Sequence, residues 1–269
     1  MEKTDKKLYV TDLDGTLVAR TEDPIPESLF PLIEEILSRG DYFAVATGRQ
    51  IENTEQIFGR VSDRIYFLVN NGGSTFYQNQ LIYAIELATG HEEELIDDIM
   101  KFRDCEIIPE MAGHYVGFTT EDGKPIIEEM KKHTYVEVAL PDLHKRTEPL
   151  TKISFNAIGR ESVDPEIASF FHEKYDGLYE VVESGHGWMD FSAVGSGKGP
   201  ALSHLAETLG VKKENIIAFG DNENDISMFR VSGLSYARDT STDFVKSNAD
   251  RVTIDPVEEL KRLLNGESL

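Results

Sequence analysis

The stretch LYVTDLDGTLV, at residues 8–18, joins a short apolar run to two aspartates and a glycine–threonine turn. The apolar run at residues 8–10 is typical of a buried strand. Asp12 and Asp14 follow it, two residues apart, and Gly15 marks a turn. Two carboxylates this close repel each other unless a cation lies between them or one keeps its proton. The stretch is therefore either a solvated turn or part of a metal site that does chemistry.

Three further runs are short, apolar and without strict alternation, as expected of strands that are buried on both faces. They are residues 42–46, 65–69 and 216–219. Apolar residues at helical spacing fill residues 29–37 and 202–209, and Gly40 and Gly210 follow as stop signals. This alternation of strands and helices predicts an α/β fold with a Rossmann-like, doubly wound parallel sheet.

The middle of the chain has a different pattern. Its periodicity predicts helices at residues 91–102, 125–132 and 165–174, and strands at residues 106–109, 115–119, 152–158 and 178–182. Such a block interrupts the parallel pattern, which resumes near Lys198. We therefore expect a discontinuous catalytic core of residues 1–83 and 188–269, with an inserted α+β cap domain at residues 84–187.

A small, polar, glycine-bearing turn follows each predicted core strand. The turns are DLDGT at residues 12–16, TGR at 47–49, NNGG at 70–73 and GDNEND at 220–225. In an open parallel sheet, ligands bind outside the carboxyl ends of the strands. The four turns therefore predict one shared site.

The side chains of these turns, together with Lys198 outside them, suit a phosphate and a hard cation. Carboxylates favour Mg²⁺, a hydroxyl and backbone N–H groups beside a glycine can cradle an anionic oxygen, and a lysine adds the positive charge that phosphate handling needs. The residues in these roles are Asp12, Asp14, Asp221, Thr47, Gly48 and Lys198. A carboxylate on Mg²⁺ that faces a clamped phosphate is a nucleophile for phosphoryl transfer. Spacing alone does not choose between Asp12 and Asp14.

Two competing motifs fail on spacing. The segment DNENDISMF at residues 221–229 begins like a calcium-binding EF-hand loop, but its sixth position is Ile226 instead of glycine. The segment SAVGSGKGP at residues 192–200 lacks the Ser or Thr that follows the lysine of a P-loop.

The motifs DLDGTL, TGR, KG and GDNEND, in this order along the chain, resemble the four motifs of the haloacid dehalogenase (HAD) superfamily of phosphatases. The large insert between the second and third motifs resembles the C2B cap of the Cof-type branch, as does NNGG after the third strand. The resemblance covers nearly the whole chain.

The resemblance implies roles for the acidic residues. Asp12 would be the nucleophile and form an aspartyl-phosphate, while Asp14 would protonate the leaving alcohol and then help activate water. Mg²⁺ would be held by the Asp12 carboxylate, the Asp14 backbone carbonyl and Asp221. Asp225 would support this site or bind the metal through water.

The resemblance also implies contacts to the substrate. The phosphoryl oxygens would be held by Thr47, Gly48, Lys198 and Asn224. The predicted substrate contacts are Arg49, Asn71, Gly72 and Trp188, although an Asn-Gly pair also suits a tight turn for backbone reasons alone.

Within the cap, the aromatic and histidine candidates are His114, Tyr115, His186 and Trp188. The last two lie in GHGWMD at residues 185–190, which we expect at the return from cap to core. Two segments depart from the Cof-type pattern, SYARDTSTD at residues 235–243 and TIDPVEELKRLL at residues 253–264. These departures remove no catalytic group, but they weaken any transfer of substrate detail.

The composition of the chain limits the kinds of partner that it can bind. The formal net charge is −22, which argues against nucleic acid and anionic membranes as partners. No apolar run reaches a membrane span, and the first ten residues lack a secretory apolar region, so we expect a cytoplasmic protein. The one cysteine, Cys105, excludes an internal disulfide and is expected to serve packing. The oligomeric state is not indicated.

The sequence thus predicts a Mg²⁺-dependent phosphatase that hydrolyses a small phosphorylated metabolite, with sugar phosphates as the first candidates and phosphorylated cofactors next. A phosphomutase or phosphotransferase on the same scaffold is the enzyme alternative. A catalytically silent metabolite-binding regulator is another alternative. A signalling receiver domain, which also forms a phospho-aspartate, is disfavoured by the large cap, because receivers are compact flavodoxin-type domains.

Overall fold

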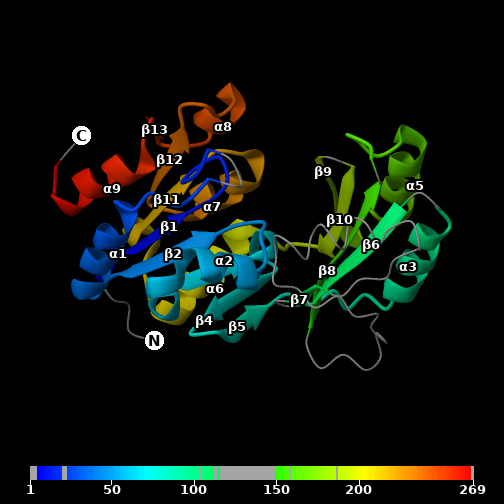
Figure 1. Ribbon diagram of the computed structural model, residues 1–269, viewed down its shortest axis with the longest axis horizontal. Coiled ribbons are helices and arrows are strands. Elements are labelled where there is room, and N and C mark those ends of the chain that lie inside the picture. Colours follow the sequence, from blue (N-terminus) through cyan, green and yellow to red (C-terminus); the bar gives the residue numbers. More distant parts are fainter. Residues whose placement is uncertain are drawn as a thin grey trace. The chain divides into compact units, whose positions relative to one another are not determined.

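The computed structural model describes residues 5–19, 23–102, 105–111, 114–115, 149–157, 159–185 and 187–267, without the side chains of residues 52, 105–111, 114–115, 184 and 185. The chain forms two compact units (Figure 1). Unit 1 comprises Met1–Arg49, Thr54–Tyr83 and Gly197–Leu269, and unit 2 comprises Gln50–Asn53 and Ala84–Ser196.

Unit 1 is built on an eight-stranded sheet in the order β13-β12-β11-β1-β2-β3-β4-β5. The strands are β1 (Leu8–Thr11), β2 (Tyr42–Ala46), β3 (Tyr66–Val69), β4 (Ser74–Tyr77), β5 (Gln80–Ala84), β11 (Ile216–Gly220), β12 (Leu234–Arg238) and β13 (Arg251–Thr253). The pairs from β13 to β3 are parallel, whereas β4 runs antiparallel to β3. The α/β fold predicted from sequence is confirmed, with an antiparallel edge added. The link from β3 to β4 is too short for a parallel crossover, which needs a dozen or more residues.

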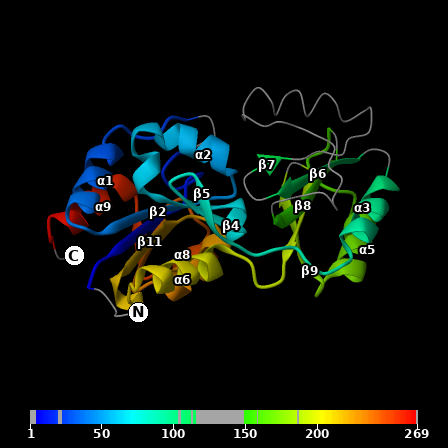
Figure 2. The ribbon, with the colours of Figure 1, turned by 90° about the horizontal axis from the view of Figure 1, so that it is seen from below.

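Helices cover both faces of this sheet (Figure 2). Leu8, Val10 and Leu68 pack against α6 (Lys198–Leu209), α7 (Ile226–Val231) and α8 (Asp243–Ser247) in one core. On the other face lie α1 (Leu29–Ser38), α2 (Ile51–Phe58) and α9 (Pro256–Leu264), where Phe58 contacts Phe67 of β3. Because β1 to β3 are buried on both faces, their sequences are largely apolar instead of alternating.

Short 3-10 turns complete unit 1. They are η1 (Gly59–Arg64), η2 (Asn70–Gly72), η5 (Lys213–Asn215) and η6 (Glu223–Asp225). Two of them carry predicted site residues: η2 begins directly after β3, and η6 begins shortly after β11.

Unit 2 is an antiparallel sheet in the order β7-β6-β8-β10-β9. Its elements are α3 (Glu92–Met100), β6 (Cys105–Met111), β7 (His114–Tyr115), β8 (Leu150–Ala157), α5 (Pro165–Tyr175), β9 (Tyr179–Gly185) and β10 (Trp188–Ala193). Its own core joins Phe155 and Phe191 of the sheet to Phe171 of α5 and Leu95 of α3. The predicted helix at residues 125–132 and the predicted strand residues 116–119 lie outside the described part of the chain.

The structure differs from the sequence prediction at β10. We expected the core to resume at residue 188, but β10 pairs with β8 and β9 in the sheet of unit 2. The division between the units falls after Ser196. Strand β10 alternates strictly, with Met189, Phe191 and Ala193 buried, which is the pattern of a sheet that packs on one face only.

Across the described helices, none combines the length and the apolar character needed to cross a membrane.

Candidate active site

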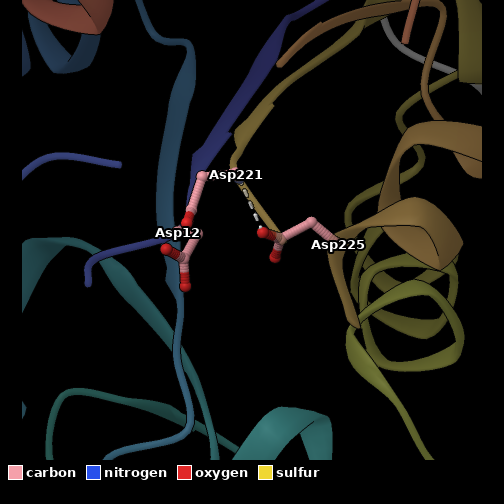
Figure 3. Close-up of side chains that lie close together, drawn as sticks. All are labelled: Asp12, Asp221 and Asp225. Atoms are coloured by element: carbon pink, nitrogen blue, oxygen red, sulfur yellow. Dashed lines mark hydrogen bonds between the residues drawn. The ribbon is translucent and has the colours of Figure 1, made fainter. Parts of the chain in front are cut away.

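Three carboxylates gather at the carboxyl ends of the neighbouring strands β1 and β11 (Figure 3). Asp12 follows β1, Asp221 follows β11, and Asp225 ends η6. One carboxylate oxygen from each lies within 4.8 Å of the others. The parallel register brings the first two together, because the backbone N–H of Asp12 donates to the Phe219 carbonyl at 2.9 Å. This grouping is the acidic cluster of the site.

Lys198 is the only lysine in direct contact with the acidic cluster among the described residues. It is the first residue of α6, and its Nζ lies 2.6 Å from Asp12 Oδ1 and 2.6 Å from Asp225 Oδ1. Lys198 is 1% exposed, Asp12 5% and Asp225 0%. A buried charge is stable only when it is paired, so these three residues depend on one another.

Burial is the main cause of the raised pKa values in the acidic cluster. Burial raises the pKa of Asp12 to about 8, although the attraction of Lys198 opposes this rise. Burial by itself would lower the pKa of Lys198, but Asp12 and Asp225 outweigh it and hold the pKa above its ordinary value. Burial also raises the pKa of Asp221. A bound cation would favour the ionised form of both aspartates.

Asp12 offers a free oxygen at this point. Its Oδ1 accepts from Lys198, but its Oδ2 is buried and has no hydrogen-bond partner. A buried, unpartnered carboxylate oxygen is costly unless a ligand completes it. Together with the carboxylate-only donor set, this atom fits a hard cation such as Mg²⁺.

The other two carboxylates are held by the turns around them. Thr16 Oγ1 donates to Asp221 Oδ1 at 2.8 Å. Asp225 Oδ2 accepts from the backbone N–H groups of Asp221 at 2.9 Å and Asn222 at 3.0 Å. Thr16 was not singled out from the sequence, although it lies in the same DLDGT turn.

Gly15 and Gly220 allow these close approaches. Gly15 has φ +85°, and a Cβ atom there would lie 2.2 Å from Asp221 Oδ2. A Cβ atom on Gly220 would lie 2.5 Å from the Cβ of Asp225. No other residue type fits either position without displacing a carboxylate of the acidic cluster.

Asp14 is paired with Arg49. The Arg49 Nε donates to Asp14 Oδ2 at 2.8 Å, and its Nη2 donates to Asp14 Oδ1 at 2.5 Å. This two-point geometry fixes the plane of the carboxyl group. The Asp14 side chain is 36% exposed, so it faces solvent more than Asp12 does. The sequence predicted that Arg49 contacts the substrate, which stays a prediction. The structure shows a contact between Arg49 and Asp14.

The turns after β2, β3 and β11 also meet, as predicted. The backbone N–H of Asn71 donates to the Thr47 carbonyl at 2.9 Å, and Asn224 Nδ2 donates to Asn71 Oδ1 at 3.0 Å. A Cβ atom on Gly48 would lie 3.3 Å from Asn71 Oδ1. Thr47 is buried, and its Oγ1 accepts from the backbone N–H of Arg49 at 3.2 Å.

Gly72 has a structural role at the start of α6. It has φ +89°, and a Cβ atom there would lie 2.3 Å from the Gly197 carbonyl oxygen and 2.9 Å from the Lys198 backbone nitrogen. Turn η2 therefore packs directly against the residue that carries the buried ammonium. This close approach explains the glycine without any contact to substrate.

The predicted contacts from the cap belong to unit 2. Trp188 begins β10 and is paired in register with Asn156 of β8. His186 lies outside the described residues, as do the side chains of His114 and Tyr115. Substrate contact by these residues stays a prediction.

Comparison with known proteins shows the family to which the chain belongs. The model of the haloacid dehalogenase-like hydrolase family matches residues 9–259. A 5-amino-6-(5-phospho-D-ribitylamino)uracil phosphatase, YbjI of Escherichia coli K12, is 23% identical over 235 residues, which are 87% of this chain and 86% of that protein. The pyridoxal phosphate phosphatase YbhA of the same organism is 25% identical over 261 residues, with 91% and 92% covered.

The fold is shared with a solved phosphatase. The structure of the HAD subclass IIB sugar phosphatase BT4131 superposes with a TM-score of 0.75 at 21% identity and covers 97% of this chain and 99% of that one. The resemblance predicted from the four motifs is thereby confirmed. With a family match over almost its full length, the chain belongs to the haloacid dehalogenase-like hydrolases and is a phosphatase of that family.

Proposed function

We propose that this phosphatase uses Mg²⁺ and hydrolyses small phosphorylated metabolites through a phosphorylated Asp12. The observation that carries this proposal is the buried Asp12 carboxylate, with Oδ1 on Lys198 and Oδ2 unpartnered inside the acidic cluster. Such an oxygen is poised to act as a ligand or as a nucleophile.

The acidic cluster divides into metal ligands and a support. Asp12 and Asp221 would hold Mg²⁺ with the backbone carbonyl of Asp14. Both oxygens of Asp225 already accept hydrogen bonds, from Lys198 and from two backbone N–H groups, so we assign Asp225 to holding the site in shape. The bound metal would neutralise negative charge between the carboxylates and the phosphate.

Two steps then use residues of this chain. In the first, an Asp12 oxygen forms a bond to phosphorus, the ester P–O bond breaks, and Asp14 gives a proton to the leaving alcohol. In the second, Asp14 takes a proton from water, the water oxygen attacks phosphorus, and the bond to Asp12 breaks to release inorganic phosphate. Lys198 would favour the ionised form of Asp12 against the effect of burial, and a bound cation would favour it further. The phosphoryl oxygens would lie against Thr47, Gly48, Lys198 and Asn224.

Sugar phosphates are the first substrate candidates, and phosphorylated cofactors are next. Three similar proteins are named for a phosphoribityl compound, pyridoxal phosphate and sugar phosphates, so the family accepts small phosphorylated molecules of different shapes. We further propose that unit 2, which the sequence predicted as residues 84–187, acts as a cap that shapes the choice of leaving group.

The test is phosphate release from a panel of sugar phosphates, nucleotides, flavin mononucleotide and pyridoxal phosphate, each measured with Mg²⁺ and with chelator. We expect phosphate release that depends on Mg²⁺ and is fastest with the sugar phosphates. Conversion of a sugar phosphate to its isomer without release of phosphate would instead identify a phosphomutase. Binding of a compound without any turnover would identify a regulator.

Two further sequence predictions concern the location of the protein in the cell and its binding partners. A cytoplasmic location and the absence of nucleic-acid partners stay predictions that rest on composition. The first is checked by fractionation of cells, and the second by a binding assay with DNA and RNA at physiological salt.

A further inference from the structure

Arg238 ends β12, the strand beside β11, at the same edge of the sheet as the acidic cluster. The register pairs Gly220 with Ala237, so Arg238 lies one position further along, level with Asp221. Its Nη1 donates to the backbone carbonyl of Thr16 at 2.8 Å. The side chain is 20% exposed and its Nε is buried, so the guanidinium is mostly withdrawn from water.

Thr16 connects this arginine to the acidic cluster. The residue is fully buried, and while its carbonyl accepts from Arg238, its hydroxyl donates to Asp221 Oδ1 at 2.8 Å. The turn that contains it is closed by hydrogen bonds between Gly15 and Val18 at 2.7 Å and between Val18 and Leu13 at 3.0 Å. A cation that holds the Thr16 carbonyl therefore also sets where its hydroxyl points.

We propose that Arg238 is a positioning residue for Asp221, acting through Thr16 on the metal-binding carboxylate. The inference rests on the proposed Mg²⁺ site. A charged donor makes a stronger hydrogen bond than a neutral one, and its planar fork loses little freedom when it is held. Groups that orient a metal ligand commonly change metal affinity by about 10- to 100-fold when they are removed.

A surface role for Arg238 does not account for this geometry. Its nearest carboxylate is Asp239, with 3.7 Å between Arg238 Nε and Asp239 Oδ1, and the Asp239 side chain is 41% exposed. An exposed pair at that distance contributes little stability. The shorter and better buried contact is the one to Thr16.

The experiment measures Mg²⁺ affinity directly by calorimetric titration of the full-length protein, without substrate. Arg238→Met keeps the aliphatic stem and removes the guanidinium, and we expect the dissociation constant for Mg²⁺ to rise about tenfold. Arg238→Lys should recover part of the loss, since it restores a charged donor. Arg251→Met, on the neighbouring strand β13, removes an arginine whose guanidinium lies 6.0 Å from the Tyr236 ring and should leave the affinity unchanged.

A double-mutant cycle tests the route through Thr16. Thr16→Val removes the hydroxyl and keeps the carbonyl, so it should also weaken Mg²⁺ binding. If Arg238 acts through Thr16, adding Arg238→Met to the Thr16→Val variant should raise the dissociation constant for Mg²⁺ by far less than tenfold. Urea unfolding of each variant confirms that the titrated protein is folded, and Arg238→Lys serves in its place if Arg238→Met does not fold.

The outcomes separate the two proposals. Wild-type protein that binds no Mg²⁺ overturns the proposed metal site and this inference together. Wild-type protein that binds Mg²⁺, with a folded Arg238→Met variant of equal affinity, overturns only the role of Arg238. Fully additive losses in the double mutant overturn the route through Thr16.

Discussion

Lys198 illustrates how one buried residue sets the chemistry of the site. Its ammonium contacts both Asp12 and Asp225, and all three side chains are nearly inaccessible to water. The sequence predicted a lysine for phosphate handling at this position. In the structure the same lysine also compensates two carboxylates, so it has a structural and a chemical role at once.

Removal of this ammonium should destabilise the protein as well as inactivate it. Lys198→Met leaves two buried carboxylates without their cation, and we expect the free energy of unfolding to fall by about 3 kcal/mol or more. Urea denaturation measures this change. Lys212→Met is the matched control, because Lys212 pairs with the exposed Asp5 and should cost less than about 1 kcal/mol. Equal losses in the two variants would contradict the account.

The Arg49–Asp14 pair makes a separate prediction about catalysis. If Arg49 holds the carboxyl group of Asp14 in place, Arg49→Met should lower kcat by about tenfold or more and leave KM nearly unchanged. Arg49→Lys should not restore kcat fully, because lysine lacks the two-point geometry. Steady-state kinetics on the best substrate of the panel distinguish the roles. A raised KM with unchanged kcat would place Arg49 at the substrate instead.

Among the elements, turn η2 packs directly against the start of α6, because Gly72 lies against the backbone of Gly197 and Lys198. Gly72→Ala adds a Cβ atom 2.3 Å from a carbonyl oxygen at φ +89°, so we expect a loss of about 2 kcal/mol or more in the free energy of unfolding. Gly40→Ala has a similar φ of +78° but meets only the end of the Lys6 side chain at 3.8 Å. That control should lose about 1 kcal/mol, and a larger loss there than at Gly72 would refute the packing argument.

In unit 2, helices α3 and α5 are joined through buried Asp98. Burial tends to raise the pKa of Asp98, but hydrogen bonds from Lys101, Lys174 and Tyr175 outweigh it and lower the pKa to about 2. A carboxyl group whose pKa is lower in the folded state stabilises the fold above its unfolded pKa, near 3.8. Its contribution, about 2 kcal/mol, should disappear as the pH falls from about 4 to about 2.

The measurement compares wild-type protein with Asp98→Asn by urea unfolding across this pH range. The difference in free energy of unfolding should be largest above pH 4 or so and shrink toward pH 2 or so. Asp97→Asn alters the exposed neighbour on α3 and should show no such dependence. A difference that stays constant down to the lowest pH would rule out the proposed contribution of Asp98.

The order of the core elements was largely predictable, because strands buried on both faces appear as short apolar runs followed by polar turns. The core was predicted to resume at residue 188, and no strand was predicted at Trp188–Ala193, where β10 lies in the sheet of unit 2. The alternation of β10 is present in the sequence, with Met189, Phe191 and Ala193 at the buried positions. The antiparallel edge of β4 and β5 was missed because its hairpin turn, Gln78–Asn79, carries no glycine.

For the whole molecule, residues far apart in the sequence meet because parallel strands bring their carboxyl ends to one edge of the sheet. That rule predicts the meeting of Asp12 with Asp221, and it extends the site to Thr47, whose contact with the phosphate stays a prediction. It could not predict which side chains pair within the site, such as Arg49 with Asp14 or Arg238 with Thr16, because those contacts depend on rotamers and turn geometry. The choice of substrate also lies beyond the motifs, since the specificity of a fold resides in its loops.

The central claim is that Asp12 carries the phosphoryl group during turnover. The most direct measurement is acid quenching of the enzyme with a ³²P-labelled substrate from the panel, followed by peptide mapping. The account predicts transient label on the peptide that contains Asp12, none with Asp12→Asn, and none without Mg²⁺. Rapid phosphate release with no labelled protein at any quench time, or label on a different residue, would contradict it.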